Sequence, residues 1–273
     1  MAIISISRKV GSFGDEIAHE VAKRMGIQVI KKADIHQLAL KCDEELADTC
    51  RKFETEMPAG FFERIFFRDP SGSSLFASLI YQEAALGDVV ILGRGSQVVL
   101  GDQPGVLKVR VVAPLAVRIE RVVKRNGISK EEATDYIKHY DLQRRSLIES
   151  IFHVGLSDWS LYDMVLNSTD LDKDLLVQVI SVVAESLGPI SEKQKTVFAD
   201  LALAKRVEAL IKKKVPTFWA YTVEVENLGQ GRLVLTGALH SQEAIQLAEN
   251  VASATEGVKE VDNQLRFIDL TKE

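Results

Sequence analysis

The chain has 273 residues, of which 46% are hydrophobic and 27% are charged, and its formal net charge is −5. These proportions are typical of a soluble globular protein and exclude a collagen-like, disulfide-scaffold or wholly disordered chain. The length predicts one large or two modest domains. The mild negative charge gives no reason to expect nucleic acid as a general partner.

Cysteine usage and the N-terminus together predict a cytoplasmic protein. Cys42 and Cys50 are the only cysteines, and their spacing fits neither a zinc knuckle nor a CxxC redox pair. Two thiols in a chain of this length favour a reducing compartment. The first residues resemble a strand that starts at once, so we expect no signal peptide, and no apolar run approaches the ~18–20 residues of a membrane span. The five histidines show no metal-ligand spacing, so no metal site is predicted.

The first 190 residues alternate strand and helix signals. Short apolar or β-rich runs predict strands at 3–6, 28–30, 89–92, 106–112 and 164–166. Apolar periodicity and caps predict helices at 15–25, 34–50, 61–67, 74–86, 114–125, from 129 onward, and 172–187. This alternation predicts an α/β fold, with a parallel sheet covered by helices on both faces.

The composition changes after Gly188-Pro189, where a helix breaker is followed by a polar, linker-like stretch. Beyond it we expect a helix at 200–214, strands at 221–226 and 232–236, a helix at 241–254 and a strand at 261–267. This order predicts a small α+β unit of the αββαβ type. We therefore place a boundary near residue 192, with one domain at 1–190 and a second at 197–270.

The strongest chemical signal is the glycine-bearing turn between the first strand and the first helix. Such a turn directs backbone N–H groups and the helix N-terminus at an anion. In the Walker A pattern, G-x-x-x-x-G-K-[ST], Gly14 aligns with the second glycine, Lys9 with the first, Asp15 with the lysine and Glu16 with the Ser/Thr. Two interpretations stay open, a phosphate-binding loop and a turn that only joins a strand to a helix.

Arginines recur at the edge of the predicted sheet where parallel-sheet proteins bind ligands. Arg94 follows the strand 89–92, Arg118, Arg121 and Arg125 lie on the helix after the next strand, and Asp141 precedes Arg144 and Arg145. Any one of these side chains is ordinarily a solvated helix residue. Because guanidinium groups bind phosphate in a bidentate manner, the whole series favours a phosphorylated ligand.

On these residues the sequence resembles the cytidylate kinase-like family, a branch of the P-loop nucleoside monophosphate kinases. The resemblance covers about residues 1–185 and rests on motifs that include I-S-I-S-R-x-x-G-S-x-G-x-x-I-A (4–18), V-V-I-L-G-R-G (89–95) and D-x-x-R-R (141–145). It implies a parallel-sheet core, a monophosphate-binding insert within 31–86 and a mobile lid. It also implies ATP and Mg²⁺ as cofactors if the protein is active.

The resemblance implies a role for each matching residue. The phosphate loop would be formed by Gly11, Ser12, Phe13 and Gly14, and Arg8 or Lys9 would replace the Walker lysine. Arg94 would lie by the acceptor monophosphate, and Arg118 and Arg121 would lie at the lid base. The transferring phosphate would be reached by Asp141, Arg144 and Arg145. The chain departs from the family pattern at Asp15, where a basic residue is usual, and at Phe13, where a small one is usual. Leu92 and Gly95 stand where authentic cytidylate kinases carry acidic residues.

The C-terminal unit resembles a BON domain. The pattern L-T-G-x-x-x-S-x-E-A (235–244) is followed by G-V-x-x-V-x-N-x-L (257–265). The resemblance implies a protein or lipid ligand and no catalysis. A dimerisation or scaffold module is an equally good interpretation, so a homo-oligomer is also expected as an option.

Two functional hypotheses follow. In the first, the protein is a nucleoside monophosphate kinase that transfers a phosphoryl group from ATP to a pyrimidine monophosphate such as CMP, since arginines can supply most of the charge neutralisation in phosphoryl transfer. In the second, the protein is a non-catalytic sensor of a nucleotide or other phosphorylated ligand, with a degenerate phosphate loop, that signals or assembles through its BON domain.

Overall fold

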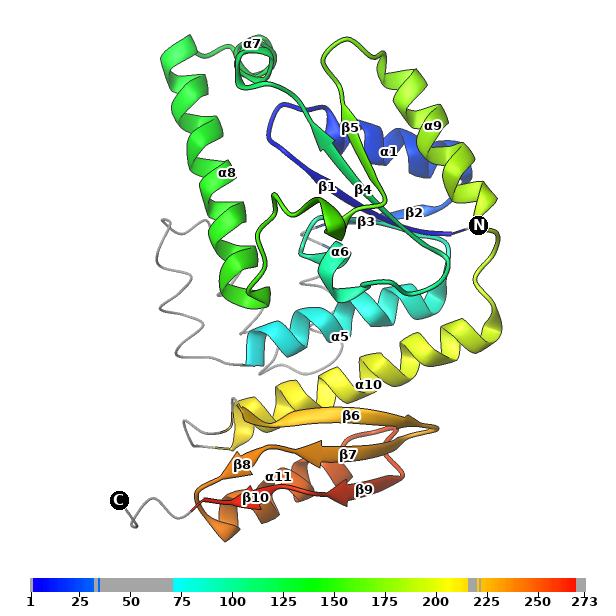
Figure 1. Cartoon of the computed structure of the whole chain (residues 1–273), viewed down its shortest axis with the longest axis vertical. Helices are drawn as coiled ribbons and strands as arrows, with labels where there is room; N and C mark the ends of the chain where they lie inside the picture. The colour runs from blue at the N-terminus through cyan, green and yellow to red at the C-terminus, as the bar shows by residue number, and fades with distance from the viewer. Residues whose placement is uncertain (1, 32–33, 35–70, 216–219, 221, 269–273) are drawn as a thin grey trace. The chain divides into compact units, whose positions relative to one another are not determined.

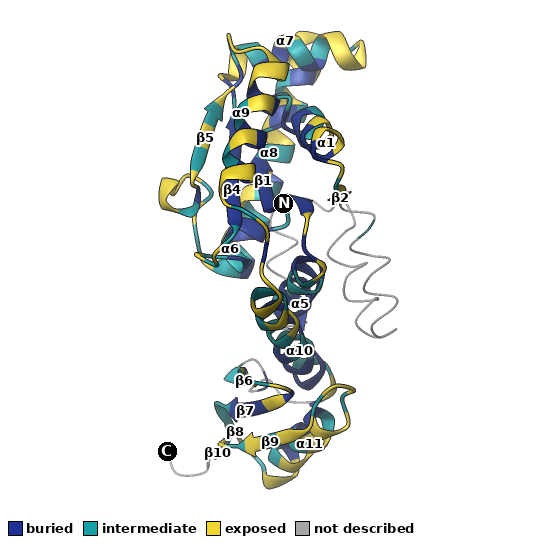
Figure 2. Ribbon diagram, turned by 90° about the vertical axis from the view of Figure 1, so that its right-hand side faces the viewer, coloured by how far each residue is buried: buried dark blue, intermediate teal, exposed yellow. Residues whose placement is uncertain are grey.

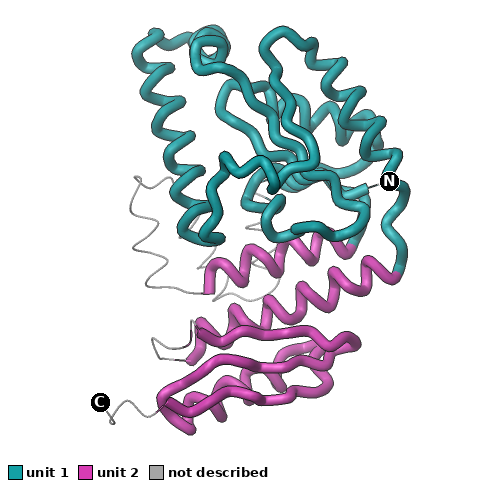
Figure 3. Tube along the Cα trace, in the orientation of Figure 1, with its two compact units in different colours: residues 1–34, 56–63, 86–192 teal, residues 35–55, 64–85, 193–273 magenta. Residues whose placement is uncertain are grey.

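The computed structural model describes residues 2–31, 34, 71–215, 220 and 222–268, which form two compact units. Unit 1 contains the described residues up to Asp34 and those from Leu86 to Glu192 (Figure 3). Unit 2 contains residues 71–85 and those from Lys193 onward. The helices predicted at 34–50 and 61–67 lie outside the described residues.

Unit 1 is built on a five-stranded parallel sheet (Figure 1). Its strands are β1 (Ile3–Arg8), β2 (Gln28–Ile30), β3 (Val89–Leu92), β4 (Val106–Val112) and β5 (Met164–Asn167), in the order β2-β3-β1-β4-β5. The central strand β1 pairs with β3 and β4, and both are buried along nearly their whole length. Figure 2 shows β1 and β4 largely in the dark blue of buried residues. Continuous apolar runs are typical of parallel strands covered on both faces, and the predicted α/β fold is confirmed.

Helices cover the two faces of this sheet. On one face α1 (Gly14–Met25) and α9 (Lys173–Ser186) form the main core with Ile4, Ile6 and Val109. On the other face lies the short α6 (Ser96–Val99), where the Ser96 and Ser5 hydroxyls are 2.7 Å apart. The sequence did not predict α6, because a single helical turn carries no apolar period.

The helices α7 (Leu115–Asn126) and α8 (Lys130–Phe152) pack against each other and are joined by residues 127–129. Gly127 ends α7 in the left-handed conformation, and Ser129 and Glu132 form the predicted capping box at the start of α8. Val122 and Ile137 pack together with Val10 of the β1–α1 loop. This small core therefore attaches the helix pair to the loop.

Unit 2 contains the helices α5 (Ser71–Leu86) and α10 (Glu192–Lys214) together with the predicted α+β unit. Only the end residues Leu86 and Glu192 of these two helices belong to unit 1. A three-stranded sheet has the order β6-β7-β9, with β6 (Glu224–Gly229) antiparallel and β9 (Glu260–Asn263) parallel to β7 (Arg232–Thr236). β8 (Ala238–Leu239) pairs with β10 (Arg266–Phe267), and α11 (Gln242–Ser253) packs on the sheets. The predicted last strand is thus divided into β9 and β10, and α10 begins eight residues earlier than predicted.

α5 packs along α10. The Tyr81 and Phe198 rings stack at 6.2 Å between centroids, and the Ser78 hydroxyl donates to the Ala202 carbonyl. The sequence analysis placed α5 in the first domain, whereas the contacts of α5 in the structure group it with the C-terminal residues. Where the chain divides into independently folding domains stays a prediction. Among the described helices, none combines the length and the apolar character needed to cross a bilayer.

Candidate phosphate-binding site

The loop between β1 and α1 has the backbone geometry of an anion-binding turn. Gly11 (φ 75°) and Phe13 (φ 64°) both adopt the left-handed conformation. Phe13 is the N-cap of α1, and its side chain makes no capping hydrogen bond. The first N–H groups of a helix have no partner within the helix, so the start of α1 offers open donors and the positive end of the helix dipole.

The carbonyl groups of the loop are held by side chains that surround it. The Ser12 hydroxyl donates to the carbonyls of Lys9 (2.8 Å) and Val111 (3.1 Å). Arg118 Nη1 donates to the carbonyl of Val10 (3.2 Å), and the Ser168 hydroxyl donates to that of Ser12 (2.8 Å). Because the carbonyls are engaged in this way, the loop is fixed with its open N–H groups available to a ligand.

Asp15, at the Walker lysine position, is paired with Arg8. Arg8 donates from Nε (3.0 Å) and Nη2 (2.7 Å) to the same carboxylate oxygen, Oδ1. Burial alone would raise the pKa of the Asp15 carboxyl, but the charge and hydrogen bonds of Arg8 outweigh it and hold that pKa below its ordinary value. Asp15 is therefore an ionised, neutralised group and not an isolated negative charge.

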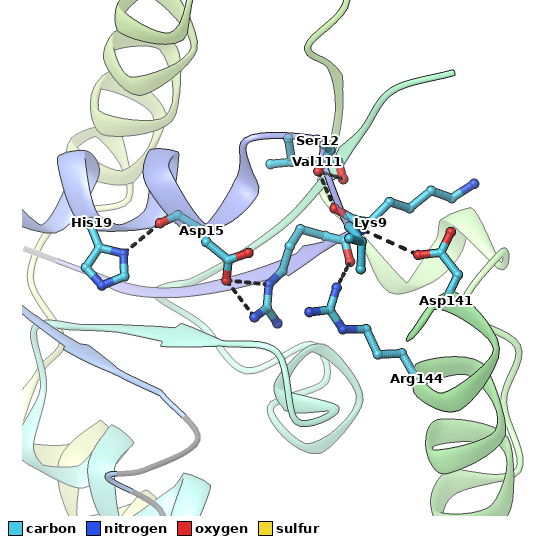
Figure 4. Close-up of polar contacts among 9 residues, drawn as sticks. Lys9, Ser12, Asp15, His19, Val111, Asp141 and Arg144 are labelled. Atoms are coloured by element: carbon cyan, nitrogen blue, oxygen red, sulfur yellow. Dashed lines mark hydrogen bonds and ion pairs between the residues drawn. The ribbon is translucent and has the colours of Figure 1, made fainter. Parts of the chain in front are cut away.

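α8 brings two of the predicted residues to the loop (Figure 4). Asp141 accepts from the Val10 N–H (3.4 Å) and from Arg118 Nη1 (2.8 Å), and Arg144 Nη1 donates to the Arg8 carbonyl (3.3 Å). Burial and then the charge of Arg8 lower the pKa of the Arg144 guanidinium to about 10. Arg144 is still charged at neutral pH and lies among Arg8, Asp15 and Asp141.

Lys9 lies among more cations than carboxylates. Burial and then the nearby Arg118 lower the pKa of its ammonium group. No hydrogen bond or ion pair joins the Lys9 Nζ to another described residue, whereas Arg8 is bound to Asp15. Of the two candidates to replace the Walker lysine, Arg8 is paired with Asp15, whereas Lys9 is available to a ligand.

The remaining predicted residues lie around the same sheet edge. Arg94 is a half-buried residue with φ 63° in the turn between β3 and α6, and Arg145 is exposed on α8. Arg121 stacks on the Phe13 ring, with 4.0 Å from its Cζ to the ring centroid, and donates to Ser168. Arg118 is 5% exposed, so its role in this state is to hold the loop and Asp141. The structure thus gathers the predicted residues at one edge, and their functional roles stay predictions.

Two residues at this edge were missed. Ser168, just after β5, holds the Ser12 carbonyl. Arg110 is a buried β4 residue whose Nη1 donates to the Ser7 hydroxyl (2.8 Å) and the Tyr162 hydroxyl (3.0 Å). The available signal was the two basic residues, Lys108 and Arg110, inside the otherwise apolar strand V-L-K-V-R-V-V, because such residues are seldom buried without partners.

The described residues fit a nucleotide phosphate better than a bare metal ion. They contain no group of three or more His, Cys, Asp and Glu side chains that could hold a metal. Magnesium usually keeps several waters and binds through substrate phosphates and one or two carboxylates. A magnesium ion at this site would therefore be held mainly by the oxygens of the nucleotide it accompanies.

Comparisons with known proteins give two family matches along the chain. Residues 3–170 match the model of the cytidylate kinase-like family, and residues 199–269 match that of the BON domain. The chain is 34% identical over 122 residues to a cytidylate kinase of Pyrococcus horikoshii, a match that covers 42% of this chain and 62% of that protein. It is 28% identical over 200 residues to a cytidylate kinase of Methanopyrus kandleri, covering 70% and 96% respectively. The chain thus spans less than two thirds of the Pyrococcus horikoshii protein.

A solved structure shares the fold. An uncharacterized protein from Eubacterium ventriosum is 21% identical, with a TM-score of 0.50, over 68% of this chain and 99% of its own. At that identity the likeness shows the fold alone. Because the family model spans more than half of the chain, and the loop and the arginines of its motifs meet at one sheet edge, the chain belongs to the cytidylate kinase-like family and carries a BON domain at residues 199–269.

Proposed function

We propose that the protein is a nucleoside monophosphate kinase that uses ATP, bound with magnesium, to phosphorylate a pyrimidine monophosphate such as CMP. A phosphate oxygen of CMP attacks the γ-phosphorus of ATP, the bond between that phosphorus and the β–γ bridging oxygen breaks, and CDP and ADP result. The observation that carries the proposal is the anion cradle at the start of α1, surrounded by more cations than carboxylates. Such a reaction depends mainly on positioning and on neutralising phosphate charge.

The chain's own residues would divide this work. The open N–H groups of the loop and Lys9 would hold the donor phosphates, and Arg94 would hold the acceptor monophosphate at the end of β3. Arg144 and the exposed Arg145 would reach the transferring phosphate from α8. We place the reaction in the cytoplasm, where ATP is abundant and where a chain with two cysteines keeps them reduced.

A coupled assay of ADP release with CMP, UMP and dCMP tests the proposal. We expect turnover with at least one of them, and we expect Arg144→Ala and Arg94→Ala each to lower kcat/KM about 100-fold or more, as for the loss of a charged group acting on the transferred phosphate. Lys138→Ala, on an exposed position of α8, is the matched control and should leave turnover unchanged. Calorimetric binding of a nucleotide with no turnover would rule out the kinase.

A second candidate, a nucleotide sensor, is favoured by the carboxylate at position 15 and by a cavity of about 390 Å³ in the C-terminal unit. Arg206, Lys214, Asn250, Thr255 and Glu256 line that cavity between α10 and α11. Its two cations against one carboxylate suit an anionic group of a BON ligand, either a lipid or a protein side chain. Calorimetry with wild type and Arg206→Ala against vesicles of anionic phospholipid tests a lipid, and sedimentation of the chain with and without ADP tests whether nucleotide binding changes its assembly.

A further inference from the structure

The Asp15–Arg8 pair places a cation near the start of α1, and this cation comes from a different sequence position than in the Walker pattern. In the Walker pattern a lysine one residue after the last glycine supplies that charge. Here Asp15 takes its place, and Arg8, from the end of β1, donates two hydrogen bonds to the Asp15 carboxylate. A positive charge is therefore still present near the helix start, but it comes from the opposite end of the loop.

Two glycines make room for the Arg8 side chain. A Cβ atom on Gly14 would lie 2.3 Å from Arg8 Cβ, and one on Gly93 would lie 2.5 Å from Arg8 Nη1. Both distances are far shorter than real contacts, so side chains at these positions would displace Arg8. The guanidinium group of Arg8 thus lies between the first turn of α1 and the turn after β3, where Arg94 follows Gly93.

Arg144 lies beside this guanidinium. Arg144 Nη1 donates to the Arg8 carbonyl, and the charge of Arg8 is the second cause, after burial, of the lowered pKa of Arg144. The Asp15 carboxylate offsets part of the repulsion between these like charges, since its charge acts on Arg144 as well as on Arg8. Arg8 Nη1 donates to none of the other described residues, so Arg8 has a donor left for a further anion.

We propose that Asp15 is a positioning residue: it fixes Arg8 so that Arg8 and Arg144 together clamp one phosphate group of the bound nucleotide. This inference rests on the proposed nucleotide binding and identifies how the site works without the Walker lysine. Asp15 itself does not touch the phosphate. It acts through Arg8, whose guanidinium offers the planar, paired donors that suit phosphate oxygens.

The sign of one substitution separates this role from simple repulsion. If Asp15 only repelled phosphate, Asp15→Asn would remove a negative charge and strengthen ADP binding. If Asp15 positions Arg8, the same change weakens ADP binding, by about 10- to 100-fold for the loss of charge-assisted hydrogen bonds. Calorimetry of the full chain with ADP, and with inorganic pyrophosphate, measures this directly.

Three further variants complete the test. Asp15→Glu keeps the carboxylate and should recover most of the ADP affinity, and Glu20→Gln, the same chemical change at an exposed α1 position, should have no effect. In an Arg8→Ala background, Asp15→Asn should weaken binding no further, because Asp15 acts only through Arg8. Arg8→Ala alone should weaken ADP binding to a similar extent as Asp15→Asn, with the thermal unfolding midpoint of each variant confirming that it is folded.

The outcomes separate a failure of the positioning role of Asp15 from a failure of the proposed nucleotide binding. Equal or tighter ADP binding by a folded Asp15→Asn variant overturns the positioning role and leaves the proposed nucleotide binding intact. Equal weakening by Asp15→Asn in both the wild-type and Arg8→Ala backgrounds also overturns it. If wild type binds neither ADP nor pyrophosphate, the proposed function and the clamp both fail.

Discussion

Two clusters of buried charge, one in each unit, are organised in opposite ways. In unit 2 the Glu208 carboxylate is 3% exposed and all its partners are inside the protein. One oxygen accepts from Ser74 (2.5 Å) and Lys212 (2.6 Å), and the other accepts from Lys205 (2.6 Å) and the Val225 N–H (3.4 Å). α5, α10 and β6 meet at this one group.

The phosphate-loop cluster in unit 1 is left incomplete. Its carbonyls are satisfied and two carboxylates are paired, but the first-turn N–H groups of α1 and Lys9 face no partner among the described residues. Burial and then the charge of Arg8 lower the pKa of Arg144. A satisfied buried cluster stabilises a fold, whereas a cluster with surplus donors and surplus positive charge indicates where an anion binds.

The largest expected effect is the loss of Glu208. Glu208→Ala leaves Lys212, which is nearly buried, without its counter-charge and leaves the Ser74 hydroxyl without its acceptor. Removing one partner of a buried ion pair costs about 3–5 kcal/mol. Urea unfolding of the full chain should show this loss, with Glu226→Ala, an exposed carboxylate on β6, as the control. A cost below about 1 kcal/mol would mean that the cluster is not a stabilising one.

The same carboxylate predicts a pH dependence. Burial would raise the pKa of Glu208, but Lys212 and Lys205 outweigh burial and lower it. A carboxyl whose pKa is lower in the folded state contributes stability above its unfolded pKa of about 4.3, and this contribution is lost as the pH falls through the folded value. The difference in unfolding free energy between wild type and Glu208→Gln should therefore shrink below about pH 4. A difference that stays constant down to pH 3 would contradict the lowered pKa.

The next effect concerns the loop, where Arg118→Ala removes the side chain that holds two carbonyls and Asp141. Arg118 donates to the carbonyls of Ala113 and Val10 and forms an ion pair with Asp141 at 2.8 Å. Leaving buried acceptors and a charge unpaired costs about 1.5–3 kcal/mol. Unlike Glu208→Ala, this variant should also weaken ADP binding, because the loop N–H groups are no longer fixed. If Arg118→Ala lowers the stability but leaves the ADP affinity unchanged, ADP binding does not depend on the order that Arg118 gives the loop.

The fold followed from the sequence because the buried strands are short runs rich in apolar residues and the long helices have an apolar face. The site followed in part. Motif order located the loop and the arginines, since strands of a parallel sheet end at a common edge. The α6 turn was missed because it is too short to show a period.

The charge state of the loop could not be predicted in the same way. Comparison with the Walker pattern treats Asp15 as a negative charge facing phosphate. Only the structure shows that Arg8 lies within 3.0 Å of it and that Gly14 and Gly93 leave the space for Arg8. The grouping of α5 with α10 was likewise invisible, since it depends on contacts such as Ser74 with Glu208, 134 residues apart.

The smallest expected effect is at Phe13, where two opposing contributions are of similar size. A non-glycine residue in the left-handed conformation costs about 1–2 kcal/mol, which Phe13→Gly would relieve. The same change removes the ring that Arg121 and Lys173 contact at 4.0 and 5.1 Å, worth about 0.5–1 kcal/mol for each exposed pair. It also removes the packing of that ring against the main core and frees the unfolded chain. The net change in unfolding free energy should be a loss of about 1 kcal/mol. Phe13→Ala loses the ring but keeps the strained φ of 64°, so it should be less stable than Phe13→Gly by about 1 kcal/mol. Equal stability of the two variants would show that the loop relaxes when the ring is removed, and that the ring, not the loop, imposes the strained conformation.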